Sequence, residues 1–213
     1  RLLLGEEKLK IISLNKYTNV KNKKKDISRN KIAIVYANGG INSGKGDEKS
    51  IGSVTTSKAI ENARKDKNVK AVVLRVNSGG GSALASEVIW RETVLAKKEK
   101  PLVVSIGDVA ASGGYYIACA ADKIIASPTS ITGSIGVFGM IPNMNEFYKS
   151  NFGITFDTVK TNDYADMGIN RKLSSFEKQK IQQGIKDVYQ TFISRVSDGR
   201  GISTKQVDNI GQG

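Results

Sequence analysis

The 213-residue sequence has no histidine and a single cysteine, Cys119. Without histidine, the chain by itself can form neither a Ser-His-Asp triad nor a Cys-His pair, and it has no imidazole ligand for zinc. A single cysteine excludes an intramolecular disulfide framework and every metal site built from several thiolates. If the protein is a hydrolase, it therefore needs a different general base.

Proline is also scarce, with three residues, and no apolar run approaches the roughly 20 residues that span a bilayer as a helix. No segment at the start has the pattern of a signal peptide. Hydrophobic residues make up 39% and charged residues 25%, which is typical of a globular domain. The sequence begins at Arg1 and stops soon after a helix is expected to start at Ser203, so we expect a piece of a longer protein.

Positive charge is in excess, with 33 Lys and Arg against 20 Asp and Glu. Residues 1–30 hold nine basic and three acidic residues, a net charge of +6. We interpret them as a basic linker or arm that precedes a domain at residues 31–213. The cluster Lys21–Lys25 could contact nucleic acid or anionic lipid. It lacks interleaved aromatic residues for base stacking, which favours a solvated linker with no nucleic-acid partner.

From Lys31 onward, apolar β-branched runs alternate with segments of helical periodicity. Strands separated by helices of this length indicate an α/β fold with a parallel sheet and crossover helices. The strands are expected at residues 31–37, 70–76, 102–106 and 123–126, and the helices at residues 53–65, 83–97 and 112–120, with Ala59, Ile60 and Ala63 facing inward in the first helix.

The C-terminal helix has a clear start signal, because Ser174 and Glu177 have the spacing of a capping box. Apolar residues then recur at helical spacing, which indicates a core or subunit contact rather than a cofactor site. We expect Gly199 to end this helix. The apolar positions are Ile181, Ile185, Val188, Phe192 and Val196.

The segment Gly39–Lys45 matches the beginning of a phosphate-binding Walker A loop, GxxxxGK. The next residue should be Ser or Thr to hold Mg²⁺, but it is Gly46. Asp47 and Glu48 would then place two negative charges beside the phosphates. We therefore interpret this segment as a flexible polar loop without a phosphate ligand.

Two other small-residue turns, Asn77–Ser82 and Ala110–Tyr115, each follow an apolar strand and precede a helix. Ligands favour this edge of an α/β sheet. Ser112 would project from the second turn beside the N–H of Gly113, and the N–H of Gly81 could complete an oxyanion hole. On spacing alone, two tight structural turns remain the alternative.

Three motifs in order closely resemble the signal peptide peptidase A family, whose members are membrane-anchored Ser-Lys proteases related in fold to Clp protease and the crotonases. They are KAVVLRVNSGGGSALAS at 70–86, PLVVSIGDVAASGGYYIA at 101–118 and ITGSIGV at 131–137. The likeness runs from about Lys31 to the end. Within the family, the chain resembles the C-terminal half of the long, two-repeat form. It implies repeated β-β-α units, with the chain truncated at the end of its repeat.

The resemblance assigns roles to single residues. Ser112 matches the nucleophile, the backbone N–H groups of Gly81 and Gly113 match the oxyanion hole, and Ser134 matches a serine that hydrogen-bonds the general-base lysine. Gly79 stands where the family usually has proline, and we expect this change to loosen the loop but to leave the N–H donors in place.

The general-base lysine itself is missing from its family position. In short members it lies in the segment corresponding to Thr161–Met167, after a strand like Ile154–Lys160, and here the position holds Ala165. In the long form this lysine comes from the N-terminal half, so we expect the isolated chain to be inactive. The in-chain alternatives are Lys149, Lys160 and Lys172.

The resemblance further implies degradation of cleaved signal peptides and other apolar peptides at the periplasmic side of the bacterial inner membrane, by a homotetramer attached through the missing N-terminal part. It requires no metal and no cofactor. Apolar pockets could be lined by Tyr115, Tyr116, Phe138 and Met140, although core packing is the favoured interpretation for each. Two other functions stay open, a crotonase-like acyl-thioester enzyme and a non-catalytic scaffold or binding subunit.

Overall fold

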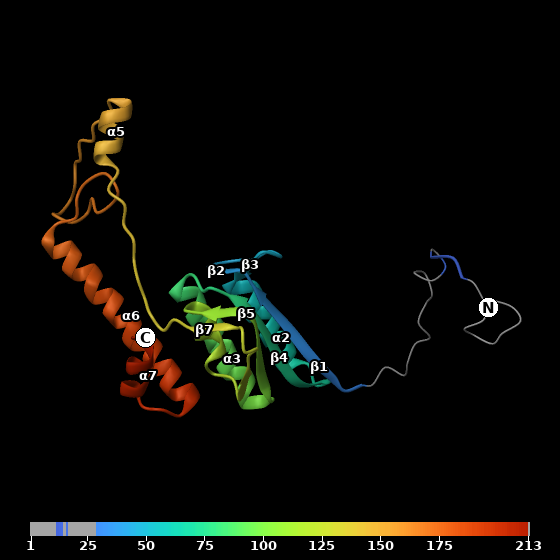
Figure 1. Cartoon of the computed structure of the whole chain (residues 1–213). Coiled ribbons are helices and arrows are strands. Elements are labelled where there is room, and N and C mark those ends of the chain that lie inside the picture. The colour runs from blue at the N-terminus through green and yellow to red at the C-terminus, as the bar shows by residue number, and fades with distance from the viewer. Residues whose placement is uncertain (1–11, 15, 17–28, 213) are drawn as a thin grey trace, which may run out of the picture. The chain divides into compact units, whose positions relative to one another are not determined.

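The computed structural model describes residues 12–14, 16 and 29–212 (Figure 1). The chain divides into two units, Arg1–Asn30 and Lys31–Gly213. The cluster Lys21–Lys25 lies outside the described residues. The second unit contains all the helices and strands discussed below.

Its main element is a parallel five-stranded sheet, which confirms the predicted α/β class. The strand order is β1-β4-β5-β6, and β7 pairs with the far end of β5, at Val109–Ala111. Two short strands form a separate parallel pair. The strands are β1 (Lys31–Asn38), β2 (Gly40–Asn42), β3 (Ser50–Gly52), β4 (Val69–Ser78), β5 (Leu102–Ala111), β6 (Lys123–Ile125) and β7 (Ile131–Gly133).

The helices begin close to where the periodicity predicts them, and the first has the predicted bounds. Their ranges are α2 (Ser53–Lys65), α3 (Ala83–Glu99), α4 (Gly113–Ala118), α5 (Asn145–Phe152), α6 (Ser175–Arg200) and α7 (Thr204–Gly211). In α3 the Ser82 side chain accepts a hydrogen bond from Ala85 N at 3.3 Å and caps the helix. Ser203 caps α7 in the same way, as predicted.

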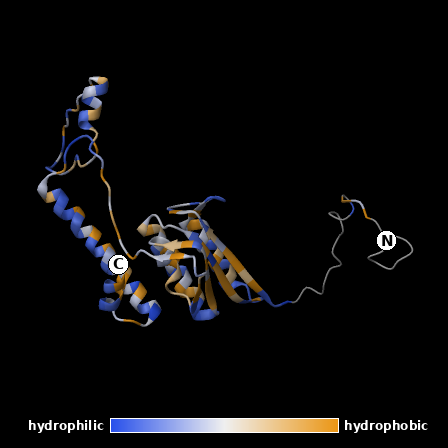
Figure 2. Cartoon of the chain, in the orientation of Figure 1, coloured by the Kyte–Doolittle hydropathy of each residue, from blue (hydrophilic) through white to orange (hydrophobic). Residues whose placement is uncertain are grey.

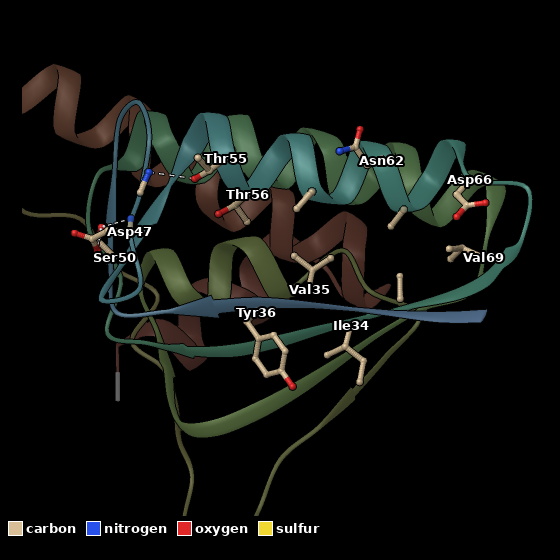
Figure 3. A pocket seen from close by; sticks show the side chains of 14 residues that line it. Ile34, Val35, Tyr36, Asp47, Ser50, Thr55, Thr56, Asn62, Asp66 and Val69 are labelled. Atoms are coloured by element: carbon tan, nitrogen blue, oxygen red, sulfur yellow. Dashed lines mark hydrogen bonds between the residues drawn. The ribbon is translucent and has the colours of Figure 1, made fainter. Parts of the chain in front are cut away.

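Alternate residues of the strands form the main core with α2, α3 and α4. In β4, for example, Val72, Leu74 and Val76 are fully buried. On the other face, Ile34 and Tyr36 of β1 are 56% and 72% exposed. Figure 2 shows hydrophobic residues along these strands, and in Figure 3 Ile34 and Tyr36 point away from α2. Helices α2, α3 and α4 thus cover one face of the sheet.

One predicted core position in α2 is wrong, because Ala59 is exposed. The buried residues of this helix are Ser53, Thr56, Ile60 and Ala63. Ala59 instead lines a cavity between α2 and β1, the edge strand of the sheet. No further strand of the described chain lies beyond β1 to cover that position.

Helix α6 starts with the predicted capping box, since Ser174 Oγ accepts from Glu177 N at 3.2 Å and Ser174 N donates to Glu177 Oε2 at 2.7 Å. Of its apolar stripe, Phe192 and Val196 are buried, whereas Val188 is 36% exposed. Only the C-terminal part of the stripe is therefore core.

The predicted end of α6 at Gly199 is wrong. The helix continues to Arg200 and ends at Gly201, whose φ of 68° is left-handed. Gly199 has another role, since a Cβ on this residue would collide with the carbonyl oxygen of Cys119. Glycine here lets α6 approach the backbone that follows α4.

The expected strand at Ile154–Lys160 is not formed. Residues 138–176 contain no buried residue, so this stretch contributes nothing to the core of the described chain. The same stretch carries exposed apolar side chains, including Phe138 at 91% and Met140 at 85%. Among the described residues, no helix combines the length and the hydrophobicity needed to cross a membrane.

We predict opposite effects of one substitution at two positions of α6. Gly184 is open, with no atom within 4 Å of an added Cβ, so Gly184→Ala should stabilise the protein by up to about 1 kcal/mol through helix propensity. Gly199→Ala should lower the free energy of unfolding by about 1–3 kcal/mol because the backbone of Cys119 must move. Urea unfolding of both variants measures the difference, and equal effects would refute the close approach of α6.

Candidate functional site

Ser112 lies in the turn between β5 and α4, in a conformation that is rare for a residue with a side chain. Its φ and ψ are 50° and −119°. Its N–H donates to Gly133 O at 3.0 Å, and its hydroxyl makes only a long contact of 3.5 Å to Gly136 O. The turn therefore presents a partly exposed hydroxyl on a strained backbone.

Ser134 occupies the equivalent point on the neighbouring strand. Ala111 of β5 pairs with Gly133 of β7, so Ser112 and Ser134 are the next residues of two adjacent parallel strands. Ser134 also has a positive φ, 48°. The register thus brings together two serines that are 22 positions apart in the sequence.

The glycine loop that follows β4 packs on β2. Ile41 N donates to Gly80 O at 2.9 Å, and Ser82 N donates to Ile41 O at 2.8 Å. This bridge uses the groups on either side of Gly81 and leaves the Gly81 N–H out of it. A Cβ on Gly81 would collide with Ile41, so only glycine permits this approach.

The same loop touches the Ser112 turn. A Cβ on Gly80 would lie 2.7 Å from Gly113 N, and one on Gly113 would lie 3.3 Å from Gly81 N. Gly113 is the first residue of α4, so its N–H has no acceptor within the helix. Two amides that the sequence places 32 residues apart are therefore neighbours beside Ser112.

A cavity of about 810 Å³ joins these features. All four residues proposed from the sequence, Ser112, Gly81, Gly113 and Ser134, line it. Of the aromatic and Met side chains expected near the site, Tyr116 and Phe138 line the cavity, whereas Tyr115 and Met140 do not. Sequence reasoning missed the contributions of Ser86 from α3 and of Val188 and Phe192 from α6.

Among the described residues that line this cavity, Tyr116 is the only ordinary titratable group. Burial raises the pKa of its hydroxyl, and a hydrogen bond to Glu87 raises it further. No lysine is among the described residues that line the cavity. Lys160 Nζ instead donates to Asp163 O at 3.1 Å and lies 3.4 Å from Asp166 Oδ1.

The other two in-chain candidates, Lys172 and Lys149, do not line the cavity at Ser112 either. Lys172 lines a separate, smaller cavity together with Arg171, and Lys149 is exposed on α5. Ala165, at the family position of the lysine, is exposed in a turn in which its N–H donates to Asn162 O at 3.3 Å. The described part of the chain thus places no lysine at Ser112.

The segment around Ala165 is held by an ion-pair cluster. Arg171 donates to both carboxylates of Asp166 and Glu177, with Nη2 distances of 2.8 and 2.7 Å. Arg171 lowers the pKa of Asp166 and of Glu177 to about 2, and Ser174 N adds to the effect on Glu177. The cluster ties this segment to the start of α6.

A second cavity, of about 600 Å³, lies between β1 and α2 (Figure 3). Its polar groups hydrogen-bond one another, since Gly46 N donates to Thr55 Oγ1 at 3.1 Å and Ser50 Oγ donates to Asp47 Oδ1 at 2.8 Å. Among the described residues that line this cavity, no hydroxyl lies beside a pair of free backbone N–H groups as Ser112 does.

The segment Gly39–Lys45 has a role that its polar sequence did not indicate. It contains β2, in which Ile41 is fully buried and supports the glycine loop. The interpretation as a flexible loop is therefore wrong for this part. Three residues of strand are too few to give a sequence signal.

The sequence was compared with known proteins. Residues 94–213 match the model of peptidase family S49. "Protease 4" of Salmonella typhi is 46% identical over 85% of this chain, and that of Haemophilus influenzae is 44% identical over 86%. The chloroplastic "Serine protease SPPA" of Arabidopsis thaliana is 33% identical over 98%. This chain spans 29%, 30% and 32% of the length of these three relatives.

Among solved structures, a ClpP1 mutant from Listeria monocytogenes has a similar fold, with a TM-score of 0.51 at 15% sequence identity. The match covers 83% of this chain and 77% of that one. At this identity the likeness concerns the fold alone. It confirms the Clp-like architecture expected from the sequence.

The backbone of Ser112 leads to a prediction about stability. Its φ of 50° with ψ of −119° is accessible to glycine at little cost. Ser112→Gly should therefore be more stable than Ser112→Ala by about 1–2 kcal/mol. Thermal or urea unfolding of the two variants measures this, and an alanine variant as stable as the glycine variant would contradict a strained turn.

The Arg171 cluster predicts a loss of local order in acid. Asp166 and Glu177 have pKa values below their ordinary ones, so the cluster stabilises the fold above about pH 4 and loses this effect as the pH falls through about 2. Hydrogen-exchange protection of residues 161–177 should decrease between pH 5 and pH 2. In Arg171→Met this decrease should be absent, and its persistence would show that other groups control it.

Proposed function

The chain belongs to peptidase family S49, and we propose that it carries the nucleophile and the oxyanion hole of a Ser-Lys serine endopeptidase. The observation that carries this proposal is the cavity that unites Ser112, on its strained turn, with the Gly81 and Gly113 amides. A hydroxyl beside two adjacent backbone donors is the arrangement that acyl transfer requires. Residues 31–213 would form the C-terminal repeat, and residues 1–30 a basic arm from the preceding half.

In the proposed reaction Ser112 attacks the peptide carbonyl and forms a tetrahedral intermediate. The N–H groups of Gly81 and Gly113 stabilise the oxyanion, which is worth about 3–4 kcal/mol per donor in a comparable site. A serine hydroxyl needs a base to remove its proton. A lysine buried in an apolar site has a depressed pKa and can act as that base. Ser134 is placed to hydrogen-bond its amine.

We infer that this lysine comes from outside residues 1–213. Support comes from the lining of the cavity, which includes no lysine among the described residues, and from Lys160, which pairs with Asp166. The curated relatives compared above are about three times as long as this chain. An N-terminal half that delivers the base would make the isolated chain inactive.

The proposed substrates are signal peptides after their release from precursors, and other apolar peptides. Val137, Phe138, Val188 and Phe192 give the cavity an apolar wall for such side chains. An extended substrate could add as a strand along Gly79–Gly81. We further propose a homotetramer of the full-length protein, attached to the bacterial inner membrane through its N-terminal part with the site on the periplasmic side.

The two alternatives have less support. A crotonase-like acyl-thioester enzyme would need a carboxylate at the site, and no Asp or Glu is among the described residues that line the cavity. It would also leave Ser112 and Ser134 without roles. A scaffold without catalysis gives no reason for strained backbone at two adjacent serines.

Labelling with a fluorophosphonate, detected by intact mass, tests this function. We expect an adduct on the full-length protein that contains this chain and none on the isolated 213 residues, because only the former holds the base. Ser112→Ala should abolish the adduct. Ser130→Ala is the control, because the Ser130 hydroxyl donates to Gly107 O at 2.6 Å, and this variant should retain the adduct.

Three other outcomes would change the account. An adduct on Ser112 in the isolated chain would place the base within residues 1–213. An adduct that survives Ser112→Ala would show that Ser112 is not the nucleophile. No adduct on either protein would favour the scaffold.

A further inference from the structure

Tyr116 connects the candidate nucleophile to the rest of the protein. It lies one helical turn after Ser112, and its N–H donates to Ser112 O at 2.9 Å. The side chain is 4% exposed and lines the same cavity as Ser112 and Gly113. Because α4 has only six residues, a shift of Tyr116 is transmitted directly to its first residue, Gly113.

The hydroxyl of Tyr116 donates to Glu87 Oε2, on α3. Arg195, on α6, donates to the same carboxylate through Nη2 at 2.7 Å and Nε at 3.3 Å. The guanidinium also lies over the ring of Trp90, 4.1 Å from its centroid. One carboxylate thereby joins three helices that are distant in the sequence.

Packing alone does not require the hydroxyl of Tyr116 or the two charged side chains that accompany it. The Tyr116 ring lies against Phe192, with centroids 4.8 Å apart, so a phenylalanine at this position could fill the same space. A buried hydroxyl must find a hydrogen-bond partner. Glu87 provides it, and Arg195 compensates the charge of Glu87. The result is a set of directional contacts that fixes the orientation of Tyr116, which apolar contacts do not.

We propose that Glu87 and Arg195 are positioning residues that act through Tyr116 to hold the start of α4, and with it the Gly113 amide, in place for the oxyanion. The inference rests on the proposed function, which makes Gly113 a donor. It adds that the C-terminal helix α6 orients the active site as well as lining it. Small displacements of a catalytic donor are sufficient to reduce turnover strongly.

The chain offers a matched control on the same helix. Glu92 of α3 accepts from Arg64 of α2 at 2.8 Å, and both side chains are about 15% exposed. This ion pair also joins two helices, but its hydrogen bonds reach no residue that lines the cavity at Ser112, whereas Glu87 accepts from Tyr116, which does line it. Glu87→Gln and Glu92→Gln therefore each remove one ion-paired charge from α3, and only Glu87 is hydrogen-bonded to a residue that lines the cavity.

The test has two readouts. Amide hydrogen exchange of Tyr116 and Cys119, whose N–H groups donate to Ser112 O and Tyr115 O, needs no activity and can be followed in the 213-residue chain. Glu87→Gln should accelerate it at least about tenfold, with no change in Glu92→Gln. In the full-length protein, Glu87→Gln should lower kcat on an apolar peptide about tenfold with KM within about twofold, since the donor acts in the transition state. Arg195→Met should act like Glu87→Gln, and Arg195→Lys should restore part of kcat.

The outcomes separate the inference from the function. Equal exchange and equal kcat in the two Gln variants would overturn the positioning role and leave Ser112 as the nucleophile. If the wild-type full-length protein neither labels at Ser112 nor cleaves peptide, the proposed function fails. The exchange readout still decides whether Glu87 and Arg195 hold α4.

Discussion

The candidate site depends on the close approach of two backbone turns that leave no space for side chains. Gly80 and Gly81 lie against the turn of Ser112 and Gly113, and a Cβ on any of these glycines would collide with neighbouring atoms. β2 holds the first turn through Ile41, and β7 holds the second through Gly133. Backbone amides need this proximity to act on one oxygen atom, which is what the proposed oxyanion hole requires.

The parallel sheet explains why these turns meet. β4 and β5 are neighbours, so their carboxyl ends lie at one edge, and β7 extends that edge beside β5. The register then places Ser134 next to Ser112. Helices α3, α4 and α6 surround the cavity, and Glu87, Tyr116 and Arg195 join these helices by hydrogen bonds. Sheet topology thus sets which residues meet, and we propose that the helix contacts hold them in position.

Much of this arrangement could be predicted from the sequence. Helix α2 and the capping box of α6 follow local patterns and were predicted closely. The four residues proposed for the site line one cavity. Small-residue turns at strand ends indicated Ser112, Gly81 and Gly113, with two structural turns as the alternative, whereas Ser134 followed from the family resemblance. Long-range relations were not predictable in this way. The local pattern predicts a helix stop at Gly199, whose packing on Cys119 is a tertiary contact, and β2 is too short to give a periodic signal.

The central claim is that Ser112 receives its base from outside these 213 residues, and a crosslink tests it most directly. Cys119 is buried and its thiol pKa is raised to about 12, so in this chain a Ser112→Cys thiol is the reactive one. In the full-length Ser112→Cys protein, a short thiol-to-amine crosslinker followed by peptide mass spectrometry identifies the lysine within reach. The account predicts a lysine outside residues 1–213. A crosslink to Lys149, Lys160 or Lys172 would contradict it.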